Sequence, residues 1–327
     1  MSHKGEMNDT YISVLMTVFN GGRFLAESID SIRSQTVQEF EFIIVDDGST
    51  DSTAKTLAQY ASRDPRIRVL RQSNQGCGAA SNTGLTIARG KYIARLDAGD
   101  IAMPNRLAKQ VAFLEQNDSV VAVGSNVLLI DDDGSPVGYG EPLLTHGEIE
   151  HKDLYHGGCG LIHPTMVVRH EAIRLAGGYR SDFRYALDLD LCLRLGEVGK
   201  LANLREALIQ CRKSREGVSG SRYVEQQEFV RRAVKDAWRR RGLPLPYPEI
   251  LEAKPQAQSA GQFHRDISLY AVNAGFYASG RKHAWRSLCL EPLALLSWKT
   301  AARAALGWAL PPLRRLRGAR SISGGTL

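Results

Sequence analysis

The sequence predicts an α/β protein built on a doubly wound, mostly parallel sheet with flanking helices and a C-terminal helical extension. Two patterns carry this prediction. Over the first 130 residues, apolar runs rich in β-branched residues alternate with segments whose apolar residues recur at helical spacing. Acidic residues also follow two of the apolar runs directly, at Asp46 and at Asp97. Alternating strands and helices imply parallel pairing, and ligands of such sheets bind at the shared carboxyl edge of the strands.

The expected strands are short apolar runs bounded by turn residues. They lie at 11–17, 41–45, 66–70, 91–96 and 120–130. The expected helices between them carry apolar residues three or four positions apart. They lie at 23–35, around 54–61, at 80–89, and after Pro104, which suits the first turn of a helix.

The second half of the chain begins with weaker patterns. Residues 140–185 are rich in Gly, His and Pro, and we expect loops there around one strand at 165–169. Helical spacing returns at 188–198. We therefore expect one domain over residues 10–215 and a separate helical region over residues 216–327.

A proline-rich run divides the predicted helical region into two parts. A long charged helix is expected at 223–241, and the proline-rich run 242–248 indicates a linker. From about residue 260 the spacing is helical again. The aromatic side chains of Trp285 and Trp298 are expected in the core of these helices rather than at an interface.

Charge is unevenly distributed along the chain. The formal net charge is +7, and the segment 292–327 holds six basic residues and no acidic one, so the rest of the chain is close to neutral. A basic tail on a neutral body indicates an anionic partner, either lipid or nucleic acid, with a solvated tail as the alternative. We expect an anionic membrane surface and no nucleic acid as the partner.

The cysteines and the N-terminus indicate the compartment. The five cysteines form no C-x-x-C pair and their number is odd, so a reducing compartment fits better than a disulfide framework or a zinc site. Residues 1–10 lack the apolar core of a signal peptide, and no apolar stretch approaches the roughly 20 residues of a membrane span. We expect a cytoplasmic protein, either free or peripheral on the inner face of the membrane.

Two polar motifs follow the first two expected strands. The first, Thr17-Val-Phe-Asn, ends a strand, so that its backbone and the Thr17 hydroxyl face the ligand edge, where Phe19 is suited to shape a base pocket; an ordinary strand end is the alternative. The second is Val45-Asp-Asp-Gly-Ser-Thr-Asp. Helix capping explains its Ser, Thr and final Asp, but it leaves Asp46 and Asp47 unexplained. Two acids at the end of a buried strand are costly unless they meet a partner, such as the N–H of a base or ribose hydroxyls.

A third motif, Asp97-Ala-Gly-Asp100, follows the fourth expected strand. Carboxylate oxygens in this position are suited to Mg²⁺ or Mn²⁺, which retain several waters and bind substrate phosphates. The alternative is an Asp-rich turn in which Asp100 caps the next helix, and spacing alone does not separate the two.

A fourth motif places an acid at the start of an apolar helix. Asp188 lies between Leu187 and Leu189, where a carboxyl group without a partner has a perturbed pKa. Such a carboxylate is suited to act as a general base on an acceptor hydroxyl. A helix N-terminal acid that is favoured by the dipole is the simpler interpretation from the residues alone.

The order of these motifs resembles that of the family 2 glycosyltransferases, which have the GT-A fold. The resemblance covers about residues 10–215, and the Val-Asp-Asp-Gly-Ser-Thr-Asp segment is its most specific part. The segments His163-Pro-Thr and Gly177-Gly-Tyr are similar to the family's acceptor side. The resemblance makes residues 10–215 the catalytic domain and makes the catalytic role of Asp188 the favoured interpretation.

The resemblance implies a role for each matching residue. Thr17 and Asp47 match positions that contact the base of the donor, and Phe19 lines that pocket. Asp97 matches the first acid of the family's metal-binding motif, with Asp100 as the second candidate ligand of Mg²⁺ or Mn²⁺.

The resemblance also implies the reaction. It is transfer of a sugar from a nucleotide-diphosphate donor, a UDP-sugar by default, to an acceptor hydroxyl with inversion, and Asp188 matches the catalytic base. The acceptor would be a glycan or a lipid-linked sugar, in the synthesis of cell-surface polysaccharide or lipopolysaccharide.

Two positions depart from the family pattern. Gly99 stands where the family commonly has a metal-ligating Asp, and Leu187 stands where it has a Glu before the base. A non-catalytic nucleotide-sugar binder is therefore the alternative function. A dinucleotide oxidoreductase is disfavoured, because the run from Gly76 to Ser81 lacks the last glycine of the fingerprint and does not follow the first strand.

Overall fold

The computed structural model describes residues 11–214, 223–244 and 259–307. Several features considered above therefore lie outside the described residues. They are the polar N-terminus at 1–10, most of the expected linker, at 245–248, and the basic residues Arg314, Arg315, Arg317 and Arg320.

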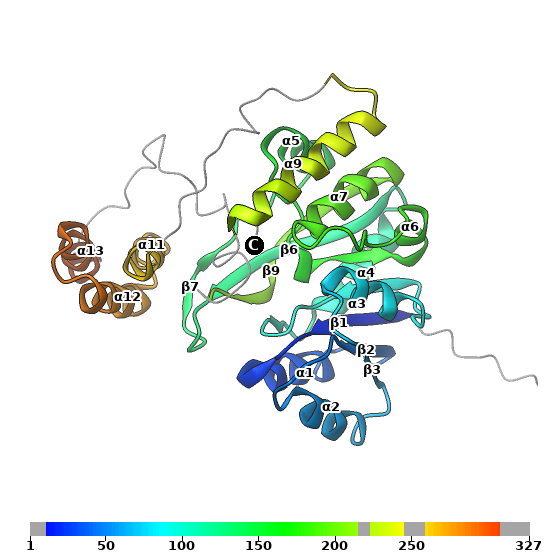
Figure 1. Ribbon diagram of the computed structural model, residues 1–327, viewed down its shortest axis with the longest axis horizontal. Coiled ribbons are helices and arrows are strands. Elements are labelled where there is room, and N and C mark those ends of the chain that lie inside the picture. Colours follow the sequence, from blue (N-terminus) through cyan, green and yellow to red (C-terminus); the bar gives the residue numbers. More distant parts are fainter. Residues whose placement is uncertain (1–10, 215–222, 245–258, 308–327) are drawn as a thin grey trace, which may run out of the picture.

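A curled nine-stranded sheet forms the centre of the molecule, with helices on both faces (Figure 1). Its order is β3-β2-β1-β4-β8-β6-β9-β5, and β7 pairs with β6. The strands are β1 (Ile12–Val18), β2 (Phe40–Asp46), β3 (Ile67–Arg71), β4 (Tyr92–Arg95), β5 (Ile101–Ala102), β6 (Val120–Ile130), β7 (Pro136–Tyr139), β8 (Val167–Arg169) and β9 (Lys200–Arg212).

The expected parallel arrangement holds for the first half of the sheet. β1 pairs in parallel with β2 and β4, and β2 pairs in parallel with β3. The second half is mixed, because β8 is antiparallel to both of its neighbours, β4 and β6, whereas β6 and β9 are parallel. The predicted α/β class is confirmed, with a mixed rather than a uniformly parallel sheet.

Helices alternate with the strands and then continue alone at the C-terminus. They are α1 (Leu25–Arg33), α2 (Thr53–Ala61), α3 (Cys77–Leu85), α4 (Arg106–Gln116), α5 (His146–His156), α6 (His170–Leu175), α7 (Leu187–Val198), α9 (Tyr223–Arg240), α11 (Ala260–Asn273), α12 (Tyr277–Leu290) and α13 (Leu295–Leu306), with 3-10 turns η1 (Gly22–Phe24) and η2 (His163–Thr165). Within the described ranges, no helix is both long and apolar enough to span a bilayer.

The apolar runs bury both faces of the sheet. In β1, Val14 and Met16 pack in one core cluster together with residues of α1, α2 and α4. Leu15 of the same strand packs in a second cluster with residues of α3, α5, α6 and α7. Neighbouring residues of a strand point to opposite faces, so β1 is covered on both sides, and it is mainly apolar, with Ser13 and Thr17 as its polar residues.

Helix α5 and strand β9 were not predicted from the sequence pattern. Helix α5 begins with a capping box, in which Thr145 accepts from the backbone of Glu148 and the Glu148 carboxylate accepts in return from the backbone of Thr145. Strand β9 runs beside β6 over most of its length, with register shifts that interrupt its alternation.

The C-terminal helices α11, α12 and α13 form a separate bundle beside β7 (Figure 1). His283 Nε2 lies 3.0 Å from Asp131 Oδ2, and Arg286 donates to Asp133 at 2.9 Å, so that the β6–β7 turn holds the bundle. The expectation of core tryptophans is wrong, since Trp285 is 68% and Trp298 59% exposed. The buried residues of α13 are the small Ser297, Thr300 and Ala304, and both tryptophans lie outside the contact between the helices.

Candidate active site

Asp46 and Asp47 both leave the carboxyl end of β2, but they have different partners. Asp46 accepts from the backbone N–H of Ser49 at 2.9 Å, which closes the turn before α2. Asp47 accepts from the backbone N–H groups of Gln75 at 2.9 Å and Gly76 at 2.8 Å. Asp46 therefore forms the turn, whereas Asp47 fastens the loop that leads into α3 to the carboxyl edge of the sheet.

The end of β1 lies beside this loop. Thr17 Oγ1 is 3.2 Å from Sγ of Cys77, the first residue of α3. The backbone N–H of Asn20 donates to Ser49 Oγ at 2.9 Å, which joins the ends of β1 and β2. Phe19 is 51% exposed there, so an aromatic face is available at the edge where Thr17 and Asp47 gather.

Asp97 follows β4 and lies between two cationic or potentially cationic groups. Its Oδ1 is 3.2 Å from Nη2 of Arg95 and 3.5 Å from Nδ1 of His163. The other ring nitrogen of His163 is 2.9 Å from the hydroxyl of Tyr179. Burial opposes ionisation, but His163 and then Arg95 prevail and lower the pKa of Asp97 to about 2. Asp97 is therefore a carboxylate at neutral pH, and it is partly exposed.

The Arg95 guanidinium is an unusual feature of this edge. It is fully buried, and within the described residues its Nε and Nη1 have no hydrogen-bond partner. A buried cation is costly unless it is paired. Asp97 is the acid that pairs with it, so the carboxylate of Asp97 is held by a charge that lies beneath the surface.

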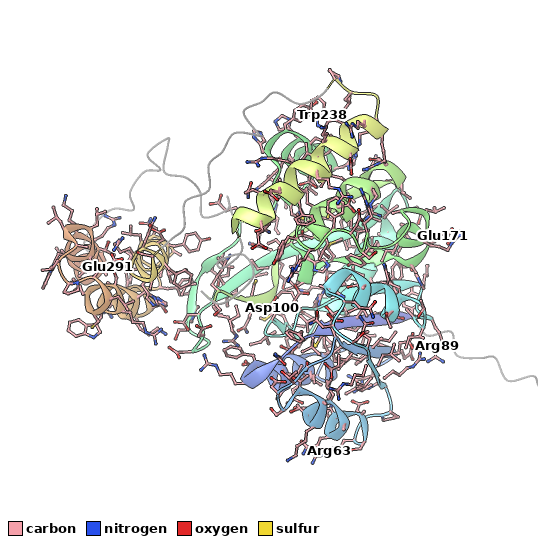
Figure 2. All side chains as sticks on the ribbon, in the orientation of Figure 1. Arg63, Arg89, Asp100, Glu171, Trp238 and Glu291 are labelled. Carbon is pink, nitrogen blue, oxygen red and sulfur yellow. The ribbon has the colours of Figure 1, made fainter. Side chains whose placement is uncertain are left out.

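Asp100 differs from Asp97 in its environment. It is buried, and Figure 2 shows it near the middle of the molecule. Its Oδ1 accepts from the backbone N–H of Arg212 at 2.9 Å. Burial, and secondly the charge of Asp97, raise the pKa of Asp100 to about 7. The two acids of the motif are thus one stable carboxylate and one group that exchanges its proton near neutrality.

We tested whether these residues fit a divalent cation. Among the described residues, no three His, Cys, Asp or Glu side chains gather as a metal site. Mg²⁺ and Mn²⁺ sites on nucleotides need only one or two carboxylates, however, because substrate phosphates and water supply the other ligands. A Cβ at Gly99, which lies between Asp97 and Asp100 in the chain, would meet no atom within 4 Å, so this turn borders open space. The donor set fits an ion that arrives with a diphosphate.

Asp188 and Asp190 on α7 differ in their ion-pair partners. Both are buried. Asp190 lies 2.5 Å from Arg194 and 3.3 Å from Arg180, so its charge is balanced. No Arg or Lys of the described chain forms an ion pair with Asp188, and burial raises the pKa of this carboxyl group. His163 partly offsets that rise and Asp97 adds to it, so Asp188 lies within electrostatic reach of both.

Asp188 has a second acidic neighbour. Burial raises the pKa of Asp153 well above its usual range, and the charge of Asp188 raises it further. Asp153 accepts from the backbone N–H of Gly160 at 2.6 Å, and its other oxygen is buried without a partner in the described chain. Asp153 and Asp188 are therefore neighbouring buried acids, and each has a raised pKa.

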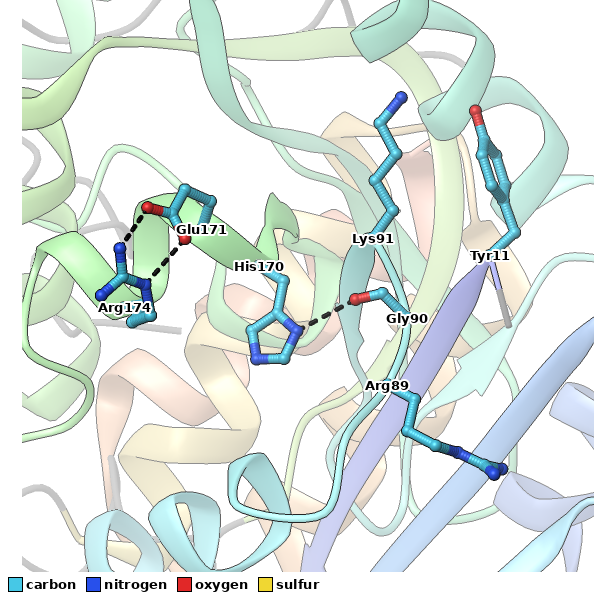
Figure 3. Close-up of a pocket in the computed structure, with 7 residues that line it drawn as sticks. All are labelled: Tyr11, Arg89, Gly90, Lys91, His170, Glu171 and Arg174. Carbon is cyan, nitrogen blue, oxygen red and sulfur yellow. Dashed lines mark hydrogen bonds and ion pairs between the residues drawn. The ribbon is translucent and has the colours of Figure 1, made fainter. Parts of the chain in front are cut away.

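A surface cavity of about 660 Å³ lies away from these residues (Figure 3). It is lined by residues that precede β1 and β4 and follow β8, and so it opens at the opposite edge of the sheet. Its basic side chains are paired: Arg89 with Glu41, and Arg174 with Glu171. The cavity contains none of the predicted site residues.

The structure brings most of the predicted site residues to one edge. Thr17 lies near the end of β1, and Phe19, Asp47 and Asp97 follow β1, β2 and β4. Asp188 interacts electrostatically with Asp97. Three residues beside them had no assigned role: Cys77, Arg95 and Tyr179. Only their positions could have suggested them, since each comes from a different segment that the sheet brings together.

A curled α/β sheet with acidic groups at its carboxyl edge is typical of α/β enzymes that bind their ligands at that edge. The chain matches the model for Glycosyl transferase family 2 over residues 13–174. EpsE of Bacillus subtilis (strain 168) is 39% identical over 207 residues, which cover 62% of this chain and 73% of that protein. The chondroitin synthase of Escherichia coli is 28% identical over 197 residues, 60% of this chain and 28% of that one. The chain belongs to glycosyltransferase family 2 and is a glycosyltransferase.

Solved structures agree on the fold. TarS 1–349 of S. aureus, in complex with UDP-GlcNAc, has a TM-score of 0.56 at 16% identity, and 91% of each chain is covered. The mannosyltransferase PcManGT of Pyrobaculum calidifontis, in complex with GDP-Man and Mn²⁺, has a TM-score of 0.51 at 16% identity, with 92% and 81% covered. These likenesses establish the GT-A fold that the motifs had implied.

Proposed function

We propose that this glycosyltransferase moves a sugar from a nucleotide-diphosphate donor to an acceptor hydroxyl with inversion, and that Asp188 is the base. One observation carries the proposal. Asp188 is a buried carboxyl group with a raised pKa and no cationic ion-pair partner in the described chain, and it lies within electrostatic reach of Asp97. Asp190, two residues further on, is neutralised by arginines and is the structural acid of the same helix.

The proposed step needs no covalent intermediate on the enzyme. The Asp188 carboxylate takes the proton of the acceptor hydroxyl, and the acceptor oxygen forms a bond to the anomeric carbon. The bond from that carbon to the diphosphate oxygen breaks in the same displacement. The raised pKa of Asp188 improves it as a base, because a base whose pKa approaches the working pH accepts a proton more readily.

The donor is proposed to lie along the ends of β1, β2 and β4. Thr17 and Asp47 would contact the base, and the exposed ring of Phe19 would line its pocket. Asp97, with Asp100, would hold Mg²⁺ or Mn²⁺ beside the diphosphate. When bound, the ion supplies positive charge that stabilises the departing diphosphate.

The substrates are proposed from chemistry and likeness together. A UDP-sugar is the default donor, since TarS has been solved with UDP-GlcNAc, although PcManGT was solved with GDP-Man and Mn²⁺. A glycan or lipid-linked acceptor in cell-surface polysaccharide or lipopolysaccharide synthesis agrees with a relative named chondroitin synthase. We propose residues 10–215 as the catalytic domain and residues 216–327 as a helical region that brings the cytoplasmic enzyme to the inner face of a membrane.

Two measurements on the full chain test the function. Thermal unfolding is followed with a panel of nucleoside diphosphates, with and without Mn²⁺, because a ligand of the folded state raises its stability. Hydrolysis of candidate donors is then compared between the wild type and Asp188→Asn. We expect stabilisation by one diphosphate and a wild type that is at least a hundredfold faster.

The departures from the family pattern at Gly99 and Leu187 favour a second candidate function, a non-catalytic nucleotide-sugar binder, which predicts a different experimental result. A non-catalytic binder would be stabilised by a nucleoside diphosphate, yet the wild type would hydrolyse every donor no faster than Asp188→Asn. Absence of stabilisation by any nucleotide would contradict both candidates.

A further inference from the structure

Exposed apolar side chains gather around the turn between α12 and α13. We name these residues the apolar tip: Leu290, Leu293, Leu295, Leu296 and Trp298. Leu293 is 99% exposed, and the others are between 51% and 66% exposed. Seven of the twelve large apolar residues that are exposed in the described chain lie between residues 285 and 306, so this concentration is local and not a general property of the surface.

The tip is exposed because the two helices pack with their small residues inward. The buried residues of α13 are Ser297, Thr300 and Ala304. Those of α12 include Gly280, where a Cβ would come within 2.5 Å of Val272. Small residues allow helices to approach closely, and the leucines are then left outside. The arrangement is stable in water only at the cost of a large apolar surface, which indicates an apolar partner.

The turn itself is ordered by polar contacts rather than by burial of its leucines. The indole N–H of Trp298 donates to the carbonyl of Pro292 at 2.9 Å, which holds this ring beside the turn. Glu291, labelled in Figure 2, pairs with Arg265 and accepts from Ser259. The apolar tip is thus presented by a structured turn whose nearest acid is already neutralised.

The charge around the tip selects the kind of partner. Lys299 and Arg303 lie on α13, and no acidic residue occurs from 292 to 327. The sequence after the described part of α13 adds four arginines. A second copy of this chain would bring the same positive charges together, whereas an anionic lipid surface attracts each of them. Tryptophan and leucine beside basic residues suit the interface of such a bilayer.

The bundle is fastened to the rest of the enzyme on another side. Asp131 and Asp133 of the β6–β7 turn bind His283 and Arg286 of α12, and the ring of Tyr270 packs against Gly138 of β7. These contacts do not involve the apolar tip, which leaves it available for a partner.

We propose that the apolar tip inserts into the interface of an anionic bilayer and docks the enzyme there through leucine and tryptophan side chains. The inference stands on the exposed surface and its charge, and it does not depend on the proposed reaction. It narrows the expected membrane contact from the basic tail as a whole to a defined turn between two helices.

Sedimentation with vesicles tests this proposal on the full chain. The vesicles are phosphatidylcholine with and without phosphatidylglycerol, and the variant is Leu293→Ser with Leu296→Ser. Both side chains are exposed, so the variant keeps its fold, which thermal unfolding verifies. The matched control is Leu175→Ser on α6, where the side chain is 60% exposed but lies on the catalytic domain.

We expect the wild type and Leu175→Ser to sediment with anionic vesicles, and the tip variant to partition at least tenfold more weakly. Lys299→Glu should weaken binding to anionic vesicles and leave the weak binding to neutral vesicles unchanged. Equal sedimentation of wild type and tip variant, or no sedimentation of the wild type, would overturn the proposal. So would a lipid-free dimer of the wild type that the tip variant abolishes, since the tip would then bind a second copy. Donor hydrolysis without lipid should be the same in all variants, which separates this test from that of the reaction.

Discussion

Replacing Asp188 and Asp190 one at a time should separate catalysis from stability on a single helix. The two acids are both buried and stand two positions apart, but only Asp190 has arginine partners. We expect Asp188→Asn to lower kcat by about 100-fold to 10,000-fold, the usual contribution of a general base. Asp190→Asn should leave the kcat of the folded enzyme within about a factor of three, because Asp190 serves the packing of α7.

The effects on stability should be the reverse of those on kcat: Asp190→Asn should destabilise the protein, and Asp188→Asn should not. Asp190→Asn leaves Arg194 without its buried counter-charge, and breaking such a pair costs about 3 kcal/mol, whereas Arg180 keeps its ion pair with Asp236 at 2.9 Å. For Asp188, burial raises the folded-state pKa above that of the unfolded chain. The folded state then binds more protons between the two pKa values, so the stability contributed by this group falls as the pH rises through that window. Asp188→Asn removes this loss and should be more stable than the wild type at pH 8.

The assay combines denaturant unfolding at pH 8 with donor turnover under saturating substrate. The pattern expected is loss of turnover with gained stability for Asp188→Asn, and loss of stability with retained turnover for Asp190→Asn. The pH profile of kcat/KM in the wild type should lose activity on the acid side at a pH above the usual pKa of an aspartate. Full turnover by Asp188→Asn, or an unstable Asp188→Asn, would refute the assignment of the unpaired acid as the base.

Three further predictions follow from buried contacts. Arg66, with help from Arg33, holds the pKa of Asp64 well below its usual value, so Asp64→Asn should lower the free energy of unfolding by about 2 kcal/mol at pH 7. This difference in stability should vanish as the pH falls through the folded-state pKa, and an equal loss at all pH values would contradict the prediction. Arg95→Met should change stability by less than about 1 kcal/mol but lower kcat/KM at least tenfold, and unchanged kinetics would show that the buried charge does not serve Asp97. Gly84→Ala places a Cβ 2.2 Å from Leu15 and should cost about 1–3 kcal/mol in denaturant unfolding without changing kcat, so a neutral effect would contradict the packing.

The sheet was predictable from the sequence where local pattern and global environment agree. Runs such as Ile12–Val18 and Phe40–Asp46 are buried along almost their whole length because helices cover both faces, and a mainly apolar run is the signal of that environment. Strand β9 was missed because its register shifts against β6 break the alternation on which the prediction depends. The capping box of Thr145 and Glu148 was a signal for α5 that the Gly- and His-rich composition obscured.

The site was predictable only as far as its chain positions. Acids that follow strands lie at the carboxyl edge of a parallel sheet, and this rule predicts the positions of Asp47 and Asp97 from the sequence. The sequence did not predict which of the two acids on α7 forms ion pairs, because one partner of Asp190 is Arg180, which lies outside that helix. The charge of Arg95 beneath Asp97 could not be inferred either, since it depends on complete burial of that guanidinium.

The helical bundle shows why apolar content alone does not locate a core. Trp285 and Trp298 have the size and spacing of core residues, and yet the helices approach through Ser, Gly and Ala. Once small residues form the contact, the large ones must lie outside, and their surroundings then depend on a partner rather than on the chain. The sequence pattern was a sound guide to the helices but not to which face of each would be buried.

Gly99, between Asp97 and Asp100, is best understood from the backbone. Gly99 has φ of +115°, a conformation that residues with a side chain rarely adopt, and its N–H donates to Ser28 at 2.8 Å. An Asp at this position would pay for that strain, even though its side chain would meet open space. The glycine at this position therefore goes together with the backbone conformation of the turn, so the difference from the family motif is more than one exchanged side chain. In the proposed donor site the edge would hold one fewer carboxylate, so the proposed donor contact would depend more on Asp97, whose charge is paired with that of Arg95.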